Sequence, residues 1–124
     1  MGAYQLPYEP ARVFPARYYG ETCVVFGYGE LDVASAGLLM DVLDTAVERG
    51  AKDLVADLSG VTFLDSSGLG ALARCAESLG RRGGRLAVVA SGRAVLRAIA
   101  VAGLAPALEV ERSLRDALVE FARP

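Results

Sequence analysis

The chain has 124 residues with 13 basic and 15 acidic side chains, a formal net charge of −2 and no histidine. This length is typical of one domain, and a hydrophobic content of 53% favours a globular core over disorder. The charge balance lacks the basic excess that attracts nucleic acids or anionic membranes. The absence of histidine excludes Ser-His-Asp and Cys-His nucleophile systems and histidine-ligated zinc sites. We therefore expect no nucleic-acid partner, no metal, no cofactor and no enzyme activity.

The first eleven residues contain two prolines and no hydrophobic period. We interpret residues 1–11 as an N-terminal arm and residues 12–124 as the domain. The start of the chain lacks the continuous apolar region of a signal peptide, and no run reaches the length of a membrane span, which predicts a cytoplasmic protein. Cys23 and Cys75 fall in a predicted strand and a predicted helix, where free buried thiols are the simplest interpretation.

The next part of the chain predicts a hairpin, a helix and a strand. Residues 12–18 and 22–28 are β-branched and aromatic runs, which indicates an antiparallel hairpin whose first strand is confined to a sheet edge by Pro15. An amphipathic helix follows, with Asp32 and Ser35 both available as N-caps and a glycine at its end. The apolar residues 53–58 then predict a short strand of the buried, parallel kind.

Helices and short strands alternate through the remaining sequence. A helix beginning around Ser66 ends in the glycine-rich turn 80–84, which lacks the order and the Lys-Ser/Thr ending of a phosphate loop. Residues 85–90 predict a strand, 92–102 a helix and 108–111 a possible last strand, before a final helix opened by a capping-box-like Ser113. This order predicts an α/β fold with a mixed, mostly parallel sheet of four to five strands and about four helices.

The segment 57–70, DLSGVTFLDSSGLG, leads from a parallel strand into a helix N-terminus, where function collects in open α/β sheets. We expect Ser66 at the cap or in the first turn, where unsatisfied backbone N–H groups and the helix dipole would tolerate a phosphate. The simpler interpretation is that residues 65–67 only cap the helix. Gly68 and Gly70 weaken that interpretation, because each costs roughly 1 kcal/mol relative to alanine in a helix. We interpret them as keeping the surface around Ser66 open.

These motifs also carry a family resemblance. LDSSGLGAL, the preceding DLSGVTF and the upstream GELD resemble the STAS family, specifically the anti-sigma-factor antagonists of bacteria, over roughly residues 12–122. The resemblance implies the same α/β fold. In that family the serine directly after the aspartate is phosphorylated by a partner anti-sigma factor that is itself a serine kinase. This implies Ser66 as the acceptor, whereas Ser67 corresponds to a neighbour that is normally not the main acceptor.

The resemblance further implies a partner-binding surface around the acceptor serine. Asp32 matches an acidic residue that supports partner binding and phosphorylation, and it also suits an N-cap. Asp65 would set the acceptor loop or act as a competing cap, and Leu69 is either an exposed contact for the partner or part of the core. Residues 91–93 match a loop near the same surface. The implied partner-binding residues are Glu30, Leu31, Asp32, Asp65, Ser66, Ser67, Gly68, Leu69 and Gly70.

Three functions remain open from the sequence. The leading hypothesis is an anti-sigma-factor antagonist that binds an anti-sigma factor and releases a sigma factor, loses this affinity when Ser66 is phosphorylated, and is reset by a phosphatase. The second is a STAS subunit of a transport or stress-signalling assembly in which Ser66 is never phosphorylated. The third, an enzyme or a nucleotide-binding module, has only the exposed serine in its favour, since the chain has no histidine and no phosphate loop.

Overall fold

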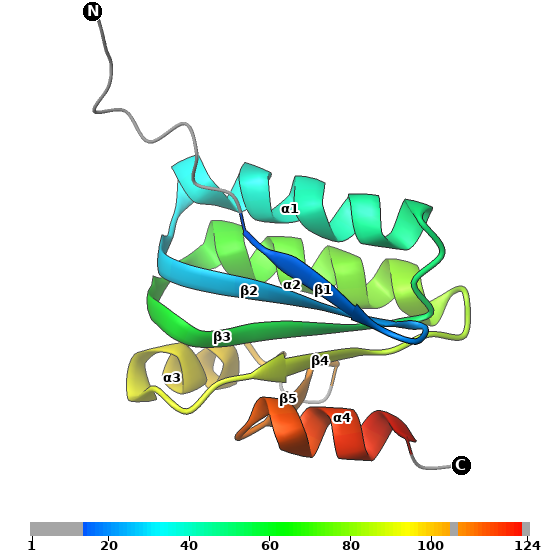
Figure 1. Cartoon of the computed structure of the whole chain (residues 1–124). Helices are drawn as coiled ribbons and strands as arrows, with labels where there is room; N and C mark the ends of the chain where they lie inside the picture. Colours follow the sequence, from blue (N-terminus) through cyan, green and yellow to red (C-terminus); the bar gives the residue numbers. More distant parts are fainter. Residues whose placement is uncertain (1–13, 105–106, 123–124) are drawn as a thin grey trace, which may run out of the picture.

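The computed structural model describes residues 14–104 and 107–122 and places their five strands in one sheet of order β1-β2-β3-β4-β5 (Figure 1). The β1 strand pairs antiparallel with β2, and all other neighbours are parallel. This confirms the predicted α/β fold with a mostly parallel sheet and an initial hairpin. The elements are β1 (Ala16–Tyr19), β2 (Thr22–Leu31), α1 (Val33–Glu48), β3 (Asp53–Leu64), α2 (Ser66–Gly80), β4 (Leu86–Val89), α3 (Arg93–Val101), β5 (Glu109–Glu111) and α4 (Leu114–Ala122).

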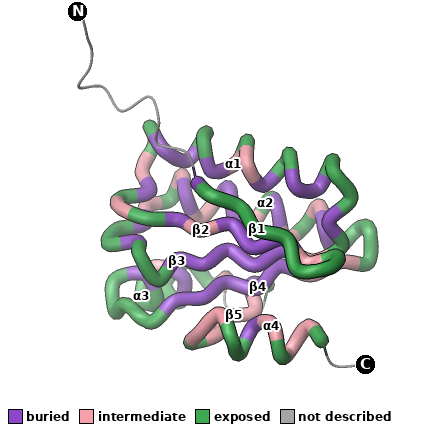
Figure 2. Tube along the Cα trace, viewed as in Figure 1, coloured by how far each residue is buried: buried purple, intermediate pink, exposed green. Residues whose placement is uncertain are grey.

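Helices cover both faces of the sheet. Because successive side chains of a strand point to opposite faces, alternate strand residues belong to different clusters. Val25 and Ala56 join the larger cluster, with side chains of α1, α2 and α3, whereas Val24 and Val55 join the smaller cluster, with α4. The central strands are accordingly buried along most of their length (Figure 2). This double burial explains why the central strands read as continuous apolar runs.

The two long central strands extend further than the sequence predicts. The predicted strands 22–28 and 53–58 continue to Leu31 and Leu64, which are partners in the parallel register. We correct both predicted ends accordingly. As a result, β2 and β3 end together on the side of the sheet where the parallel strands have their carboxyl ends, on the left in Figure 1.

Glycines that look like turn residues lie inside this strand pair. A Cβ atom on Gly60 would come within 3.2 Å of the carbonyl oxygen of Gly27, so its absence permits a close approach of the two backbones. Two register shifts, opposite Phe26–Tyr28 and Gly29–Glu30 of β2, each place one extra residue in β3 and let the pairing continue beyond the glycines.

The β1 strand forms one edge of the sheet, as predicted from Pro15. It begins after this proline, and Gly20, with φ of 63°, closes the hairpin to β2. The predicted strand 12–18 is therefore shifted, and its first two residues lie outside the described part of the chain. The predicted arm, residues 1–11, also lies outside the described residues.

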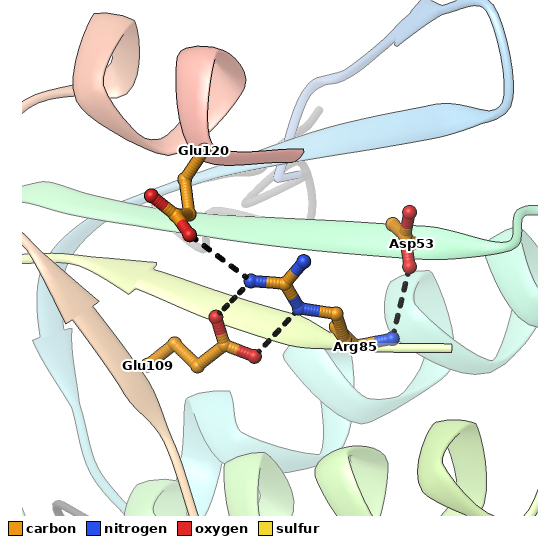
Figure 3. Close-up of polar contacts among 4 residues, drawn as sticks. All are labelled: Asp53, Arg85, Glu109 and Glu120. Carbon is orange, nitrogen blue, oxygen red and sulfur yellow. Dashed lines mark hydrogen bonds and ion pairs between the residues drawn. The ribbon is translucent and has the colours of Figure 1, made fainter. Parts of the chain in front are cut away.

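Arg85, directly before β4, contacts three other elements, namely β3, β5 and α4 (Figure 3). The Arg85 Nε and Nη2 groups donate to the two carboxylate oxygens of Glu109 at 2.9 and 2.6 Å, and Nη2 lies 3.8 Å from Glu120 of α4. The guanidinium also lies 4.8 Å from the ring centre of Phe121, and the Arg85 N–H donates to Asp53 Oδ1 at 3.0 Å. The hydrogen bonds from Arg85 lower the pKa of Glu109. Arg85 thereby ties the start of β4 to β5 and α4.

Both cysteines are free and buried, as the sequence predicts. Burial raises the pKa of the Cys75 thiol to about 12, and the negative charge of Asp44 adds to the rise. Burial also raises the pKa of Cys23. Within the described ranges, none of the helices is long and apolar enough to cross a membrane.

Candidate functional site

The carboxyl ends of β2 and β3 bring the GELD and LDSSGLGAL motifs together. Leu31 and Leu64 are register partners, and the backbone N–H of Asp65 donates to the Leu31 carbonyl oxygen at 3.1 Å. Asp32 and Asp65 are therefore neighbours, and each directly precedes a helix. The two helices, α1 and α2, pack against each other, so their positive ends point toward the same edge of the sheet. We call the surface that is formed there by Glu30, Asp32, Val33, Phe63, Asp65 and Ser66 the Ser66 edge.

Asp65 is the N-cap of α2, and Ser66 is its first helical residue. The Asp65 Oδ1 atom accepts hydrogen bonds from the N–H groups of Ser67 at 2.8 Å and Gly68 at 3.3 Å. The Ser66 side chain is exposed and Ser67 is half-buried. Two of the first-turn N–H groups that we expected to be unsatisfied are therefore already bound by the Asp65 carboxylate. A phosphate at Ser66 would instead lie near an existing negative charge.

Asp32 caps α1 in a reciprocal arrangement. Its Oδ1 atom accepts from the N–H groups of Ala34 and Ser35 at 3.0 and 3.2 Å, and the Ser35 hydroxyl oxygen accepts from the Asp32 N–H at 2.9 Å. This is a capping box, so of the two predicted candidates Asp32 is the N-cap and Ser35 its buried partner. The hydrogen bond from the Ser35 N–H is the main cause that lowers the pKa of Asp32. The Ser66 edge thus carries a firmly ionised, rigidly held carboxylate.

Gly68 supports the Ser66 edge from within the core. It is buried, and a Cβ atom there would lie 2.5 Å from Leu64 Cδ1 and 3.3 Å from Leu31 Cβ. The interpretation that Gly68 keeps the surface open is therefore wrong, because its missing side chain lets α2 approach the ends of β2 and β3. Gly70 is half-buried, and the nearest atom to its added Cβ would be Arg74 Nη1 at 3.2 Å.

The exposed apolar side chains near the site are not the ones that the motifs suggest. Leu69 is half-buried and packs against the main core, which favours core packing of the two alternatives left open. Val33 is 77% exposed directly after Asp32, and Phe63 is 47% exposed as the register partner of Glu30. Sequence reasoning missed both. The available signals were that Val33 falls outside the buried helical period and that Phe63 alternates with a buried leucine.

The predicted partner-binding residues thus divide by burial. Glu30 and Ser66 are exposed, Asp32, Asp65, Ser67, Leu69 and Gly70 are half-buried, and Leu31 and Gly68 are buried beneath them. In the part of the chain that the structure describes, no cluster of three His, Cys, Asp or Glu side chains could hold a metal ion. The arrangement offers an exposed hydroxyl at a rigid helix end, with carboxylates and two apolar side chains around it. Such a surface suits recognition by another protein.

Comparison with known proteins identifies the family. The sequence model of the STAS domain family matches residues 14–117 of this chain. The chain belongs to the STAS domain family. Its relatives include RsfB of Mycobacterium tuberculosis, an anti-sigma-F factor antagonist that is 37% identical over 90 residues, which are 73% of each chain. The STAS membership predicted from the two motifs is confirmed.

Solved STAS structures agree with the fold. The crystal structure of an anti-sigma factor antagonist from Mycobacterium paratuberculosis is 34% identical, covers 93% of this chain and 97% of its own, and has a TM-score of 0.82. Unphosphorylated SpoIIAA, also an anti-sigma factor antagonist, has a TM-score of 0.76 over 88% of this chain and 96% of its own. At 22% identity, this second likeness concerns the fold alone.

Proposed function

We propose that this STAS domain is an anti-sigma factor antagonist whose binding is switched off by phosphorylation of Ser66. The observation that carries the proposal is the position of the exposed Ser66 side chain at the first turn of α2, beside the neighbouring N-caps Asp32 and Asp65. The names of the relatives from the two mycobacteria support the same function. The protein then acts in the cytoplasm as a binding partner, and the chemistry at Ser66 is performed by another protein.

In the unphosphorylated state, the anti-sigma factor docks on the Ser66 edge and releases its sigma factor. Val33 and Phe63 supply exposed apolar contacts, and the Asp32 carboxylate pairs with a basic group of the partner. The buried Leu31 and Gly68 act by positioning the helix ends. The anti-sigma factor is also the serine kinase that uses Ser66 as its acceptor.

Phosphorylation changes the charge of a surface that is already formed. A phosphate adds about −1.5 to −2 charges at pH 7. The Asp65 carboxylate occupies the N–H groups of Ser67 and Gly68, so these donors are not available to neutralise the phosphate. The added charge therefore faces the partner. There it repels acidic groups of the partner, or it is buried against polar groups that lose their bound water and gain no hydrogen bond in return. A phosphatase restores the binding form.

The test uses purified candidate anti-sigma factors from the same genome and measures their affinity for the full chain. We expect Ser66→Ala to bind like the wild type and Ser66→Asp to bind at least about tenfold more weakly, as expected for a charge placed within an interface. Incubation with the partner and ATP should add one phosphate, which Ser66→Ala abolishes and the matched control Ser67→Ala retains. Equal binding of Ser66→Ala and Ser66→Asp would overturn the switch. If the chain is instead a STAS subunit of a transport or stress-signalling assembly, we expect no mass shift at Ser66.

A further inference from the structure

A second surface lies at the carboxyl end of β4, beyond the Ser66 edge. One hollow there, of about 310 Å³, is lined by the apolar side chains of Leu96 and Val110 and by Arg112. An adjoining, more open hollow shares Ser91 and Leu96 with the first. We call the two together the arginine groove. It is lined by residues 90–91, by Arg93, Leu96 and Arg97 of α3, and by Val110 and Arg112.

The outward face of α3 mixes apolar side chains with the arginines. Val95 and Ile99 are buried against the core, as the helical period requires. Outside that buried face Leu96 is 38% exposed and Val101 is 81% exposed, and much of this helix is drawn as exposed in Figure 2. Helix spacing places Arg93 beside both Leu96 and Arg97, at i+3 and i+4, and Arg97 beside Val101, at i+4. Exposed apolar side chains set among charged ones are typical of a protein-binding surface.

The arginine groove carries positive charge that no ion pair neutralises. Among the ion pairs of residues 14–104 and 107–122, none involves Arg93, Arg97 or Arg112, whereas Arg81 and Arg85 pair with glutamates. None of the lining residues is acidic. Glu111 lies between Val110 and Arg112 in sequence, and strand alternation directs it to the other face of β5.

The two neighbouring surfaces have opposite charge. The Ser66 edge, at the ends of β2 and β3, carries Glu30, Asp32 and Asp65, whereas the arginine groove follows the end of the adjacent parallel strand β4. Ser91, which lines the groove, comes two residues after that strand. A single partner that spans both surfaces therefore meets a negative region and then a positive one. Such a pattern fixes the orientation of a partner and opposes reversed docking.

We propose that the arginine groove binds an acidic segment of a partner protein. An apolar side chain of that segment packs against Leu96 and Val110, while its carboxylates pair with Arg93, Arg97 and Arg112. This inference deepens the proposed function, because it states the chemistry of the anti-sigma factor segment that lies beyond the Ser66 edge. The exposed leucine provides the contact area, and the arginines select acidic over basic segments.

A direct test of the groove uses the unphosphorylated full chain and the synthetic peptide acetyl-Glu-Asp-Leu-Leu-Glu-Asp-amide. Amide resonances are followed by NMR during the titration. We expect shifts confined to the groove, including Ser91, Leu96 and Val110. The double variant Arg97→Glu/Arg112→Glu should weaken the peptide at least about tenfold, since two exposed attractions become repulsions. The matched control Arg82→Glu changes an exposed arginine of the turn after α2 and should leave the affinity unchanged.

Other occupants give different results in the same titration. A peptide whose leucines are replaced by serine should bind at least about tenfold more weakly, since the apolar area that both leucines remove from water is lost. Equal binding of that peptide would overturn the apolar part of the proposal. Inorganic phosphate that displaces the peptide and reproduces its shifts would show a simple anion site, and self-association abolished by Arg97→Glu would show that a second copy is the occupant. An absence of shifts in the groove would also overturn the proposal.

The complex with the anti-sigma factor separates this inference from the proposed function. We expect Arg97→Glu/Arg112→Glu to slow association with the anti-sigma factor and to weaken the complex at least about tenfold at low salt. If the Ser66 variants switch binding while the groove variants bind like the wild type, the groove inference fails and the proposed function stands. If the acidic peptide binds the groove but no anti-sigma factor binds the chain, the proposed function fails and the groove remains an acidic-segment site.

Discussion

The substitution Gly68→Ala tests how the Ser66 edge is built. The added Cβ would lie 2.5 Å from Leu64 Cδ1, and would also approach Leu31 Cβ at 3.3 Å and the Leu31 carbonyl oxygen at 3.4 Å. Leu64 is only 5% exposed, so its side chain has little room to move away. The first turn of α2 must therefore shift outward from the ends of β2 and β3.

Two opposing effects determine the size of the change. Overpacking of this kind costs about 1–3 kcal/mol. Alanine regains up to about 1 kcal/mol of helix propensity relative to glycine. The 2.5 Å approach to Leu64 favours the upper part of the overpacking range, so we expect Gly68→Ala to lower the free energy of unfolding by about 1–2 kcal/mol. Gly70→Ala is the matched control in the same helix, because its Cβ would meet only the flexible end of Arg74. It should leave stability unchanged or raise it by up to about 1 kcal/mol.

Urea unfolding followed by circular dichroism measures both variants. We expect the urea midpoint of Gly68→Ala to fall and that of Gly70→Ala to stay the same or rise, with unchanged m-values. The double variant Leu64→Ala/Gly68→Ala should be less destabilised than the sum of its single variants, because removing the Leu64 side chain makes room for the new methyl group. A Gly68→Ala protein at least as stable as the wild type would refute the packing role of Gly68.

Three further predictions concern single contacts. Asp65→Ala should lower the free energy of unfolding by about 1 kcal/mol, because the cap of α2 is lost. Asp65→Asn keeps an accepting oxygen and should lower it by only a few tenths of a kcal/mol. Thermal unfolding compares the two variants, and equal losses would refute the capping role. Arg85→Met should speed amide exchange in α4 but not in α2. Because the pKa of Glu109 lies below its ordinary value of 4.5, the stability from this pair is fully present above that pH and is lost as the pH falls through the lowered pKa. Arg85→Met should therefore flatten the acid limb of stability against pH, and an unchanged limb would contradict this. Cys75, whose pKa is raised to about 12 by burial, should resist iodoacetamide at pH near 8 until urea unfolds the chain; rapid labelling of the native protein would show that it is accessible.

Local patterns in the sequence predicted much of the fold because they depend on near neighbours in the chain. Helical spacing and turn glycines located the four helices of the described residues, and strand propensity located the hairpin. Asp32 and Ser35 could be recognised as capping residues because a cap involves only residues of the first turn. The GELD and LDSSGLGAL motifs are also sufficient to identify the STAS family, because they are read directly from the sequence.

The glycines show where local reasoning fails. Gly20 and Gly50 have φ angles of 63° and 93°, and turns of this kind are readable from the sequence. Gly60 and Gly68 instead provide close approach to other segments, at Gly27 and at Leu31. Because Gly27 and Leu31 belong to β2, far from these glycines in the sequence, the local sequence does not distinguish Gly60 and Gly68 from turn residues. The predicted ends of β2 and β3 were too early for the same reason.

The amino-acid sequence by itself determined that Ser66 begins a helix and that the chain has no histidine to act as a catalytic base. Only the tertiary structure placed Asp32 beside Asp65 and assembled the arginine groove from α3 and the residues around β5. The physical reason is that helix caps form within one turn, whereas these surfaces depend on the register of parallel strands whose pairing is set by burial across the whole sheet.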